Sequence, residues 1–129
     1  MSIWTHVNGS IRIDTFEGLI DSKITLNKLL GKFYDECELP GGSEDLLTLN
    51  HSFTLITKSQ SMITLSFSGD LRDFDKSDVN DILIPWIKNL TKDQCVRQGF
   101  VQIEIEFPEI YIDMRYKEEE WHIKESIEE

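Results

Sequence analysis

Cysteine is nearly absent from this 129-residue sequence, which contains only Cys37 and Cys95. Neither residue belongs to a Cys-x-x-Cys motif, and two cysteines cannot build a disulfide framework. Without a secretory signal, we expect both thiols to be free and to behave as buried or half-buried small side chains.

Long apolar runs are missing as well. None approaches the roughly 20 residues that are needed to cross a bilayer. The first residues, MSIWTHVNGSIRID, carry a polar side chain at almost every second position, which is not the pattern of a secretory signal. The apolar fraction of 40% and the aromatic fraction of 10% suit a folded chain. We therefore expect one soluble, cytoplasmic domain over residues 1–129.

Basic residues are few: 13 Lys and Arg against 24 Asp and Glu give a formal net charge of −11. A surface this negative repels phosphate backbones and anionic lipid, so direct binding to nucleic acid or to a membrane is not expected. The charge favours a basic partner, such as the positively charged groove of an enzyme that acts on nucleic acid. The alternative is that the charge serves only solubility.

Known catalytic and metal-binding patterns are also missing. The three histidines lie far apart and show no metal-ligand spacing. The stretch DLRDFD lacks the glycine and the closing glutamate of an EF-hand, and LPGGSEDL lacks the Lys-Ser/Thr ending of a P-loop. No cysteine or serine is placed by the sequence beside a histidine for nucleophilic catalysis. We therefore expect no enzymatic activity, no cofactor and no metal.

Alternating apolar residues predict the strands. Period two is clear over residues 3–13 and 99–107, and it recurs over 110–116 after a turn at Pro108 and Glu109. Residues 51–57 and 62–68 predict a hairpin across KSQS, with Gly69 ending its second strand. After a turn at KEEE, WHIKESI is either a last strand or part of a loose acidic tail over about residues 118–129.

Helical spacing marks two segments. The first is weakened by Gly31 and has Ser22 or Thr25 as possible caps; it contains Leu26, Leu29, Leu30 and Phe33. The second follows Asp75 or Ser77 as caps, with Asp78 in its first turn. Pro85 should kink this second helix or start another short one.

The order strand, helix, strand, strand, helix, strand, strand favours an α+β fold. We expect a mainly antiparallel sheet with two helices on one face, in the split β-α-β (ferredoxin-like) topology with an extra C-terminal hairpin. A five- or six-stranded α+β sheet with another strand order is the alternative.

Two helices on one face leave the other face of the sheet open. Its residue types are those enriched in interface cores, so it suits a homodimer or another partner protein; the alternative is a partly exposed face covered by the C-terminal segment. Acids rather than basic residues lie among the rings, which argues against base stacking. In the predicted register this face carries Trp4, His6, Asn8, Arg12, Met62, Phe100, Gln102, Glu104, Tyr111, Asp113 and Arg115.

An acidic stretch, GDLRDFDKSDVND (residues 69–81), lies between a predicted strand and a predicted helix. Together with the acidic C-terminal region it predicts a surface for a basic partner. We expect the partner-binding residues to be Asp70, Arg72, Asp73, Asp75, Glu104, Glu106, Trp4 and Phe100. A magnesium site made by Asp70, Asp73 and Glu44 is the less favoured interpretation.

The arginines suggest an alternative site. Arg72 and Arg97 flank predicted strand ends beside acids. One interpretation pairs Arg72 with Asp70 or Glu44 in a structural ion pair. The other makes Arg72, Arg97, His6 and Glu44 a site for a nucleotide ligand, such as a cyclic or ADP-ribose-type second messenger.

Four blocks, WTHVNGSIRID, LPGGSED, SGDLRDF and VRQGFVQIEIE, together resemble small uncharacterised proteins of bacteriophages and prophages. The resemblance implies a bacterial host cell and a binding role against host machinery. We therefore expect an inhibitor of a nucleic-acid-directed defence enzyme, for example a CRISPR effector. A protein that sequesters a nucleotide messenger and a self-assembling phage accessory protein are the alternatives.

Overall fold

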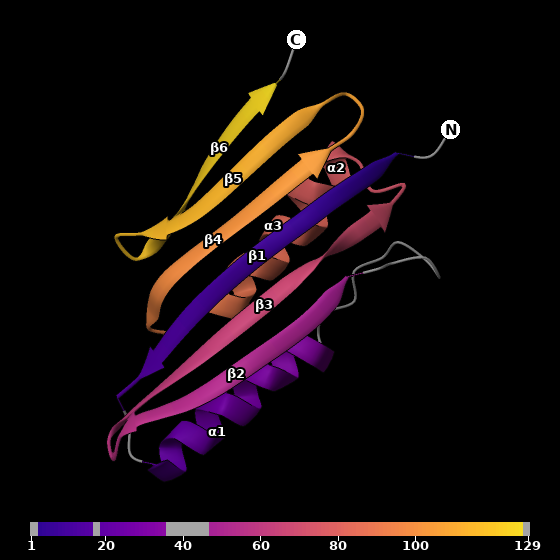
Figure 1. The fold of residues 1–129 in the computed structure, drawn as a ribbon. Helices are drawn as coiled ribbons and strands as arrows, with labels where there is room; N and C mark the ends of the chain where they lie inside the picture. The colour runs from indigo at the N-terminus through magenta and orange to yellow at the C-terminus, as the bar shows by residue number, and fades with distance from the viewer. Residues whose placement is uncertain (1–2, 17–18, 36–46, 128–129) are drawn as a thin grey trace.

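The computed structural model describes residues 3–16, 19–35 and 47–127. Six strands form one sheet in which every neighbouring pair is antiparallel, in the order β2-β3-β1-β4-β5-β6 (Figure 1). The strands are β1 (Trp4–Thr15), β2 (Thr48–Thr57), β3 (Gln60–Arg72), β4 (Val96–Ile105), β5 (Ile110–Lys117) and β6 (Glu120–Ile127).

The helices lie on one face of this sheet (Figure 1). Helix α1 (Leu19–Leu30) runs on the β2 side and continues into a π-helical turn, η1 (Gly31–Asp35). A second helical segment runs behind β1 and β4 and consists of α2 (Lys76–Asp78), η3 (Val79–Leu83) and α3 (Ile84–Thr91). Among the described residues, no helix is long and apolar enough to span a membrane.

Local sequence signals explain the second helical segment. Asp75 is its N-cap: the Asp75 side chain accepts a hydrogen bond from the Asp78 amide at 3.0 Å, and the Asp78 carboxylate accepts one from the Asp75 amide at 3.2 Å. Pro85 lies in the first turn of α3, where its missing amide donor is tolerated. Of the alternatives that the sequence left open, Asp75 rather than Ser77 is the cap, and Pro85 lies at the start of a further short helix.

Two boundary predictions are wrong. Helix α1 begins at Leu19, before both expected caps, Ser22 and Thr25. Gly69 does not end its strand, because β3 continues to Arg72. At Gly69 the strand continues with φ at 154°, which an L side chain rarely adopts, and the residue still pairs with Val7 of β1.

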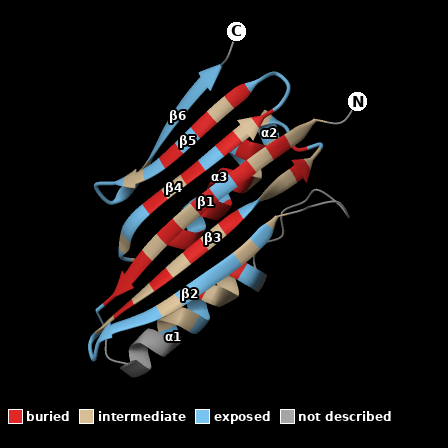
Figure 2. Cartoon of the chain, viewed as in Figure 1, coloured by how far each residue is buried: buried red, intermediate tan, exposed pale blue. Residues whose placement is uncertain are grey.

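The core lies between the helices and the middle of the sheet. Buried residues concentrate on β1, β3, β4, β5 and the inner sides of the helices, whereas β2 and β6 are largely exposed (Figure 2). Three rings join the layers: the Phe33 ring stacks on Trp86 with centroids 6.0 Å apart, and Trp86 meets Phe67 edge-on at 5.4 Å. This aromatic cluster holds the end of the α1–η1 segment against β3 and α3.

The predicted ferredoxin-like topology with an added hairpin is wrong. The structure is instead one antiparallel sheet of six strands whose helical cover is short and uneven. Helix α1 lies along the β2 side, and the other helical segment is broken into three pieces behind the centre (Figure 1). The number and spacing of the predicted helices and strands do not determine how much of the sheet the helices cover.

The C-terminal hairpin is a regular part of the sheet. Residues 120–127 form β6, paired along its length with β5 from Lys117↔Glu120 to Ile110↔Ile127. The two-residue turn Glu118–Glu119 has φ of 55° and 67°, as a type I′ turn requires. Trp121 ties this hairpin to α3, because its indole Nε1 donates a hydrogen bond to Thr91 Oγ1 at 2.9 Å.

Candidate functional site

The face of the sheet opposite the helices is called the open face below. The sequence placed eleven residues on this face, and the strand register confirms that they share it: Trp4 pairs with Arg72, His6 with Glu104, and Gln102 with Asp113. Among the described residues, no helix crosses this face (Figure 1). The strand register therefore sets the positions of the open-face residues, and no described helix separates them from a binding partner.

His6 is held between two carboxylates on this face. Its Nδ1 contacts the Asp70 carboxylate, and its Nε2 lies 3.0 Å from Glu106 Oε2. Asp70 belongs to β3, and Glu106 follows β4, so the imidazole links the two neighbours of β1. When both ring nitrogens donate to carboxylates, the imidazolium form is favoured.

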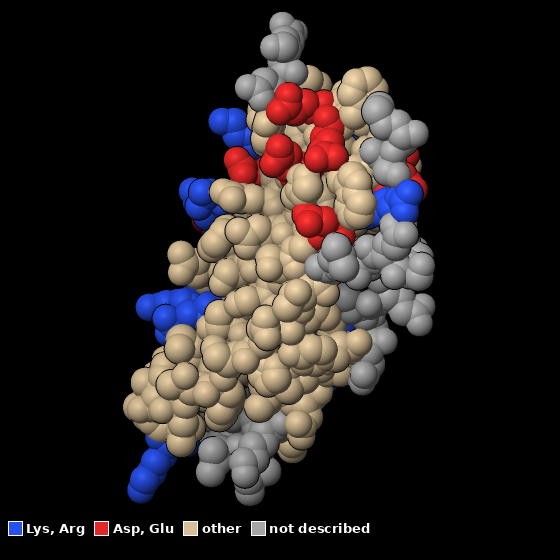
Figure 3. Space-filling view, turned by 45° about the vertical axis from the view of Figure 1, so that its right-hand side comes forward, with Lys and Arg blue, Asp and Glu red and all other residues tan. Residues whose placement is uncertain are grey.

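More acids adjoin this histidine. Glu104 is the register partner of His6 on β4, and Asp113 follows two residues beyond Tyr111, the partner of Glu104 on β5. We call Asp70, Glu104, Glu106 and Asp113 the acid end of the open face. Asp70, Glu104 and Asp113 line a polar groove of about 760 Å³ together with Asn8, Gln102 and Tyr111, and Glu106 adjoins it through His6. Figure 3 shows Asp and Glu side chains gathered at one end of the molecule.

The two carboxylates change the protonation of His6. Its pKa is raised above 6.5, first by the hydrogen bond to Asp70 and next by the one to Glu106, while partial burial opposes the rise. The folded state therefore binds this proton more tightly than the unfolded state. The resulting stabilisation is fully present below the unfolded pKa and is lost as the pH rises through the raised pKa.

We expect His6→Gln to remove this pH dependence. Because the His6 side chain is 39% exposed, its ion pairs contribute only about 0.5 kcal/mol. The wild-type free energy of unfolding should fall by this amount as the pH rises above the raised pKa. Urea unfolding from slightly acidic to alkaline pH measures it. His122→Gln is the control, since the one carboxylate near His122 among the described residues is that of Glu120, at 3.6 Å. Identical pH profiles for wild type and His6→Gln would contradict the assignment.

The expected partner-binding residues are only partly brought together. Asp70, Glu104, Glu106 and Trp4 lie at one end of the open face. Phe100 lies on the same face but nearer its middle, opposite Ser10. Asp75 instead caps the helical segment, so its role is structural. Asp73 is hydrogen-bonded to the start of the chain, because its Oδ1 accepts a hydrogen bond from the Ile3 amide at 3.3 Å.

The two arginines of the nucleotide hypothesis are far apart. Arg72 is level with Trp4, and Arg97 lies next to Val96, which is level with Ile13. Nine residues of strand separate these levels, or about 30 Å. Arg72 Nε lies 3.8 Å from Asp73 Oδ2, and the Asp70 carboxylate contacts His6. Of the other expected ligands, His6 lines the groove at the acid end and Arg97 lines a different groove beside α3. Glu44 lies outside the described residues.

A buried acid that the sequence gave no reason to select lies at the far end of the open face. The Asp14 side chain is 1% exposed; its Oδ1 accepts a hydrogen bond from Arg12 Nε at 3.1 Å. Its Oδ2 has no hydrogen-bond donor among the described residues, and Arg97 Nε lies 4.0 Å away. Arginines thus gather around a carboxylate here, and charge changes sign along the open face.

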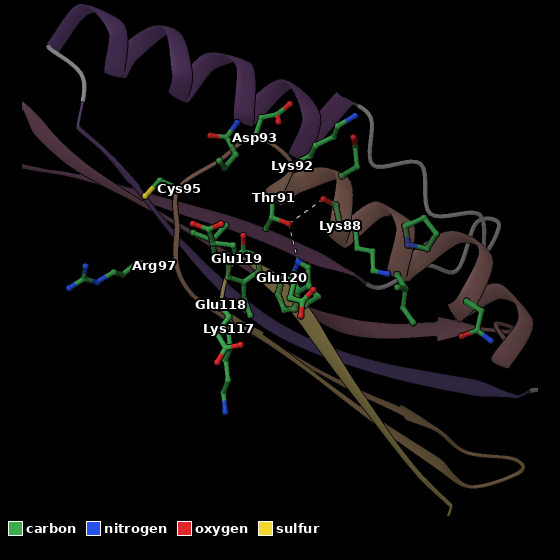
Figure 4. Close-up of a pocket in the computed structure, with 18 residues that line it drawn as sticks. Lys88, Thr91, Lys92, Asp93, Cys95, Arg97, Lys117, Glu118, Glu119 and Glu120 are labelled. Atoms are coloured by element: carbon green, nitrogen blue, oxygen red, sulfur yellow. Dashed lines mark hydrogen bonds between the residues drawn. The ribbon is translucent and has the colours of Figure 1, made fainter.

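A second groove, of about 1000 Å³, lies between α3, the start of β4 and the β5–β6 turn. Its charges are mixed: Lys88 and Lys92 come from the end of α3, and Glu118 and Glu119 come from the turn (Figure 4). Its central hydroxyl, Thr91 Oγ1, accepts from Trp121 and donates to the Lys88 carbonyl at 3.1 Å. The groove is therefore a junction between helix and hairpin, with its central polar group already paired.

The described residues provide no arrangement of side chains that supports a metal site or a catalytic nucleophile. Within residues 3–16, 19–35 and 47–127, no group of three or more His, Cys, Asp or Glu side chains is placed to hold a metal ion. Of the proposed magnesium ligands, Asp70 contacts His6 and Glu44 lies outside the described residues. Cys95 is exposed and free, while Cys37 and Ser43 also lie outside them.

The comparisons with known proteins give no relative: no family model, no curated protein and no solved structure matches this chain.

Proposed function

We propose that this protein is a non-enzymatic inhibitor that binds a basic surface of a host nucleic-acid-directed enzyme through the acid end of its open face. The observation that carries the proposal is the convergence of Asp70 and Glu106 on His6, with Glu104 beside them on a face that no described helix crosses. The contacts with His6 hold the Asp70 and Glu106 carboxylates in place, so they lose little side-chain entropy when a cationic surface binds.

Charge supports the choice of partner. A net charge of −11 attracts a surface that evolved to hold nucleic acid, and carboxylates on a rigid sheet meet the arginine and lysine side chains of such a surface. The resemblance to small bacteriophage proteins favours a host defence enzyme, such as a CRISPR effector. The nucleotide-binding alternative has no comparable support, because Arg72 and Arg97 lie at opposite ends of the sheet.

Affinity capture from a bacterial lysate followed by binding to the purified partner tests the proposal. We expect the dissociation constant to rise at least tenfold between about 0.1 and about 0.5 M salt, because screening weakens contacts between exposed charges. Glu104→Lys should weaken binding at least tenfold, since it places a like charge against the basic surface. The partner's own activity on nucleic acid should fall as the wild-type protein is added.

Asp81→Lys is the matched control. It changes the net charge by the same amount, but Asp81 is an exposed residue of η3 on the helix side of the sheet. Equal losses for Glu104→Lys and Asp81→Lys would mean that only the overall charge matters. Binding that ignores salt, or a captured partner without a basic surface, would reject the proposal.

A further inference from the structure

The edge strand β2 carries none of the residue types that usually protect a sheet edge. Its ten residues, TLNHSFTLIT, include no Asp, Glu, Lys, Arg, Pro or Gly. Exposed edges normally carry charges, prolines or bulges, because their unpaired amides and carbonyls otherwise pair with another strand. The register of β2 is irregular only between Leu55 and Thr57, so residues 48–55 form a regular ribbon.

The opposite edge of the sheet is different. Strand β6 carries Glu120, Lys124 and Glu125, and Lys76 of α2 pairs with Glu125 at 3.1 Å. These charges would have to be desolvated or matched if another strand were added there. Among the described residues, β2 is therefore the sheet edge whose side chains oppose pairing least.

Exposed apolar side chains gather near β2. Within the described part of the chain, eight large hydrophobic residues are exposed, and five of them lie on or near β2: Leu55, Ile56, Ile24, Tyr34 and Phe16. The Tyr34 hydroxyl contacts His51 Nδ1 of β2 at 2.9 Å, which ties η1 to this edge. A main-chain pairing at β2 would thus have apolar side chains to pack beside it.

We propose that a second copy of this chain binds here, with β2 pairing antiparallel to β2 of the other copy about a two-fold axis. The distribution of charge indicates where two copies can meet. Copies that each carry −11 repel one another, so contact is favoured where charge is absent. Both β2 and residues 60–69 of β3 are free of charged residues, and Figure 3 shows a wide surface without Lys, Arg, Asp or Glu below the acidic cluster.

Symmetry agrees with this occupant. An antiparallel pair of identical strands about a two-fold axis is self-complementary, and opposite residues point to the same side of the sheet. The side of β2 that bears Leu49, Phe53 and Leu55 would meet the same side of its copy, near both α1 helices. The hydroxyl-rich side, with Thr48, Ser52 and Thr54, would continue the open face.

The pairing has a consequence for the open face. A two-fold axis through the β2 edge, perpendicular to the sheet, places both open faces on the same side of one continuous sheet. The dimer therefore presents two acid ends to one side, and a partner with two basic patches would bind with avidity. The dimer itself does not depend on the proposed function and is tested without any partner.

Sedimentation or light scattering on the purified full chain tests the pairing. We expect a mass of twice 15.0 kDa that falls toward 15.0 kDa on dilution. Leu55→Lys should give only the monomer, because each copy would bring a new cation to the shared strip. Thr54→Lys, at another exposed position of β2, should do the same and decides the matter if Leu55→Lys fails to fold by circular dichroism.

Ile123→Lys is the control, since Ile123 is 43% exposed on the other edge strand and Leu55 is 48% exposed. It should leave the dimer intact. Hydrogen exchange should show β2 amides that lose protection on dilution while β3 amides stay protected. A monomer at every concentration would overturn the proposal, as would a dimer that survives both β2 variants. Loss of the dimer with Ile123→Lys would place the interface on the other edge and overturn the proposal. Loss of the dimer with Phe100→Glu would place the interface on the open face and overturn it as well.

Discussion

Replacing Phe33 by alanine is expected to lower the free energy of unfolding by about 4 kcal/mol, because a fully buried ring is lost and a cavity remains. Phe33 is 0% exposed. Its ring contacts Trp86 at a centroid distance of 6.0 Å, Phe67 at 6.5 Å and Tyr34 at 5.0 Å. It is the point at which η1, β3 and α3 meet.

The expected loss is large for this protein. Domains of this size are stable by only about 5–15 kcal/mol, so Phe33→Ala removes a substantial part of the total. Urea unfolding followed by circular dichroism measures the change. Ile24→Ala is the control, since Ile24 is an α1 residue that is 61% exposed, and its truncation should cost little. Similar losses for the two variants would show that Phe33 does not anchor the helical layer.

Replacing Gly9 by alanine is expected to destabilise the protein by about 2 kcal/mol through overpacking. A Cβ atom on Gly9 would lie 2.5 Å from Cζ of Phe67 and 3.1 Å from Cγ2 of Val101. The Phe67 ring cannot retreat freely, because it is 1% exposed and contacts Phe33 and Trp86. A shift of the ring therefore disturbs the aromatic cluster as well.

A double-mutant cycle tests this close approach. Phe67→Leu shortens the side chain, so Gly9→Ala should cost less in that background than in the wild type. Gly99→Ala on β4 is the control. Its Cβ would meet Cη2 of Trp121 at 2.9 Å and not Phe67, and Trp121 is half-buried, so the cost should be smaller and should not depend on Phe67→Leu. Additive effects of Gly9→Ala and Phe67→Leu would show that the two sites do not meet.

Sequence patterns predicted the individual elements well where the signal is local. Five strands were predicted to within a few residues, and the sixth was left open as a strand or a loose tail. The Asp75 cap and the break at Pro85 followed from backbone chemistry. The predicted strand end at Gly69 was wrong, because a glycine can also lie within a strand. The start of α1 was missed since no capping residue marks it clearly.

The ferredoxin-like prediction was wrong about where the helices lie relative to the sheet. A count of strands and helices does not say how much of a six-stranded sheet two short helices cover, nor along which side α1 runs. These properties depend on contacts between residues far apart in the chain. Phe33 on Trp86 and Trp121 on Thr91 are two such contacts, and no local period encodes them.

The candidate site divides in the same way. The sequence alone determined which residues share the open face and that the surface is strongly acidic, because side-chain alternation and charge are local properties of the chain. Only the tertiary structure decided that His6 meets Asp70 and Glu106, which are 64 and 100 residues away, and that Arg72 and Arg97 lie apart. The reason is strand register: hydrogen bonds between strands set which side chains lie level with one another, and that choice is made by the packing of the whole sheet.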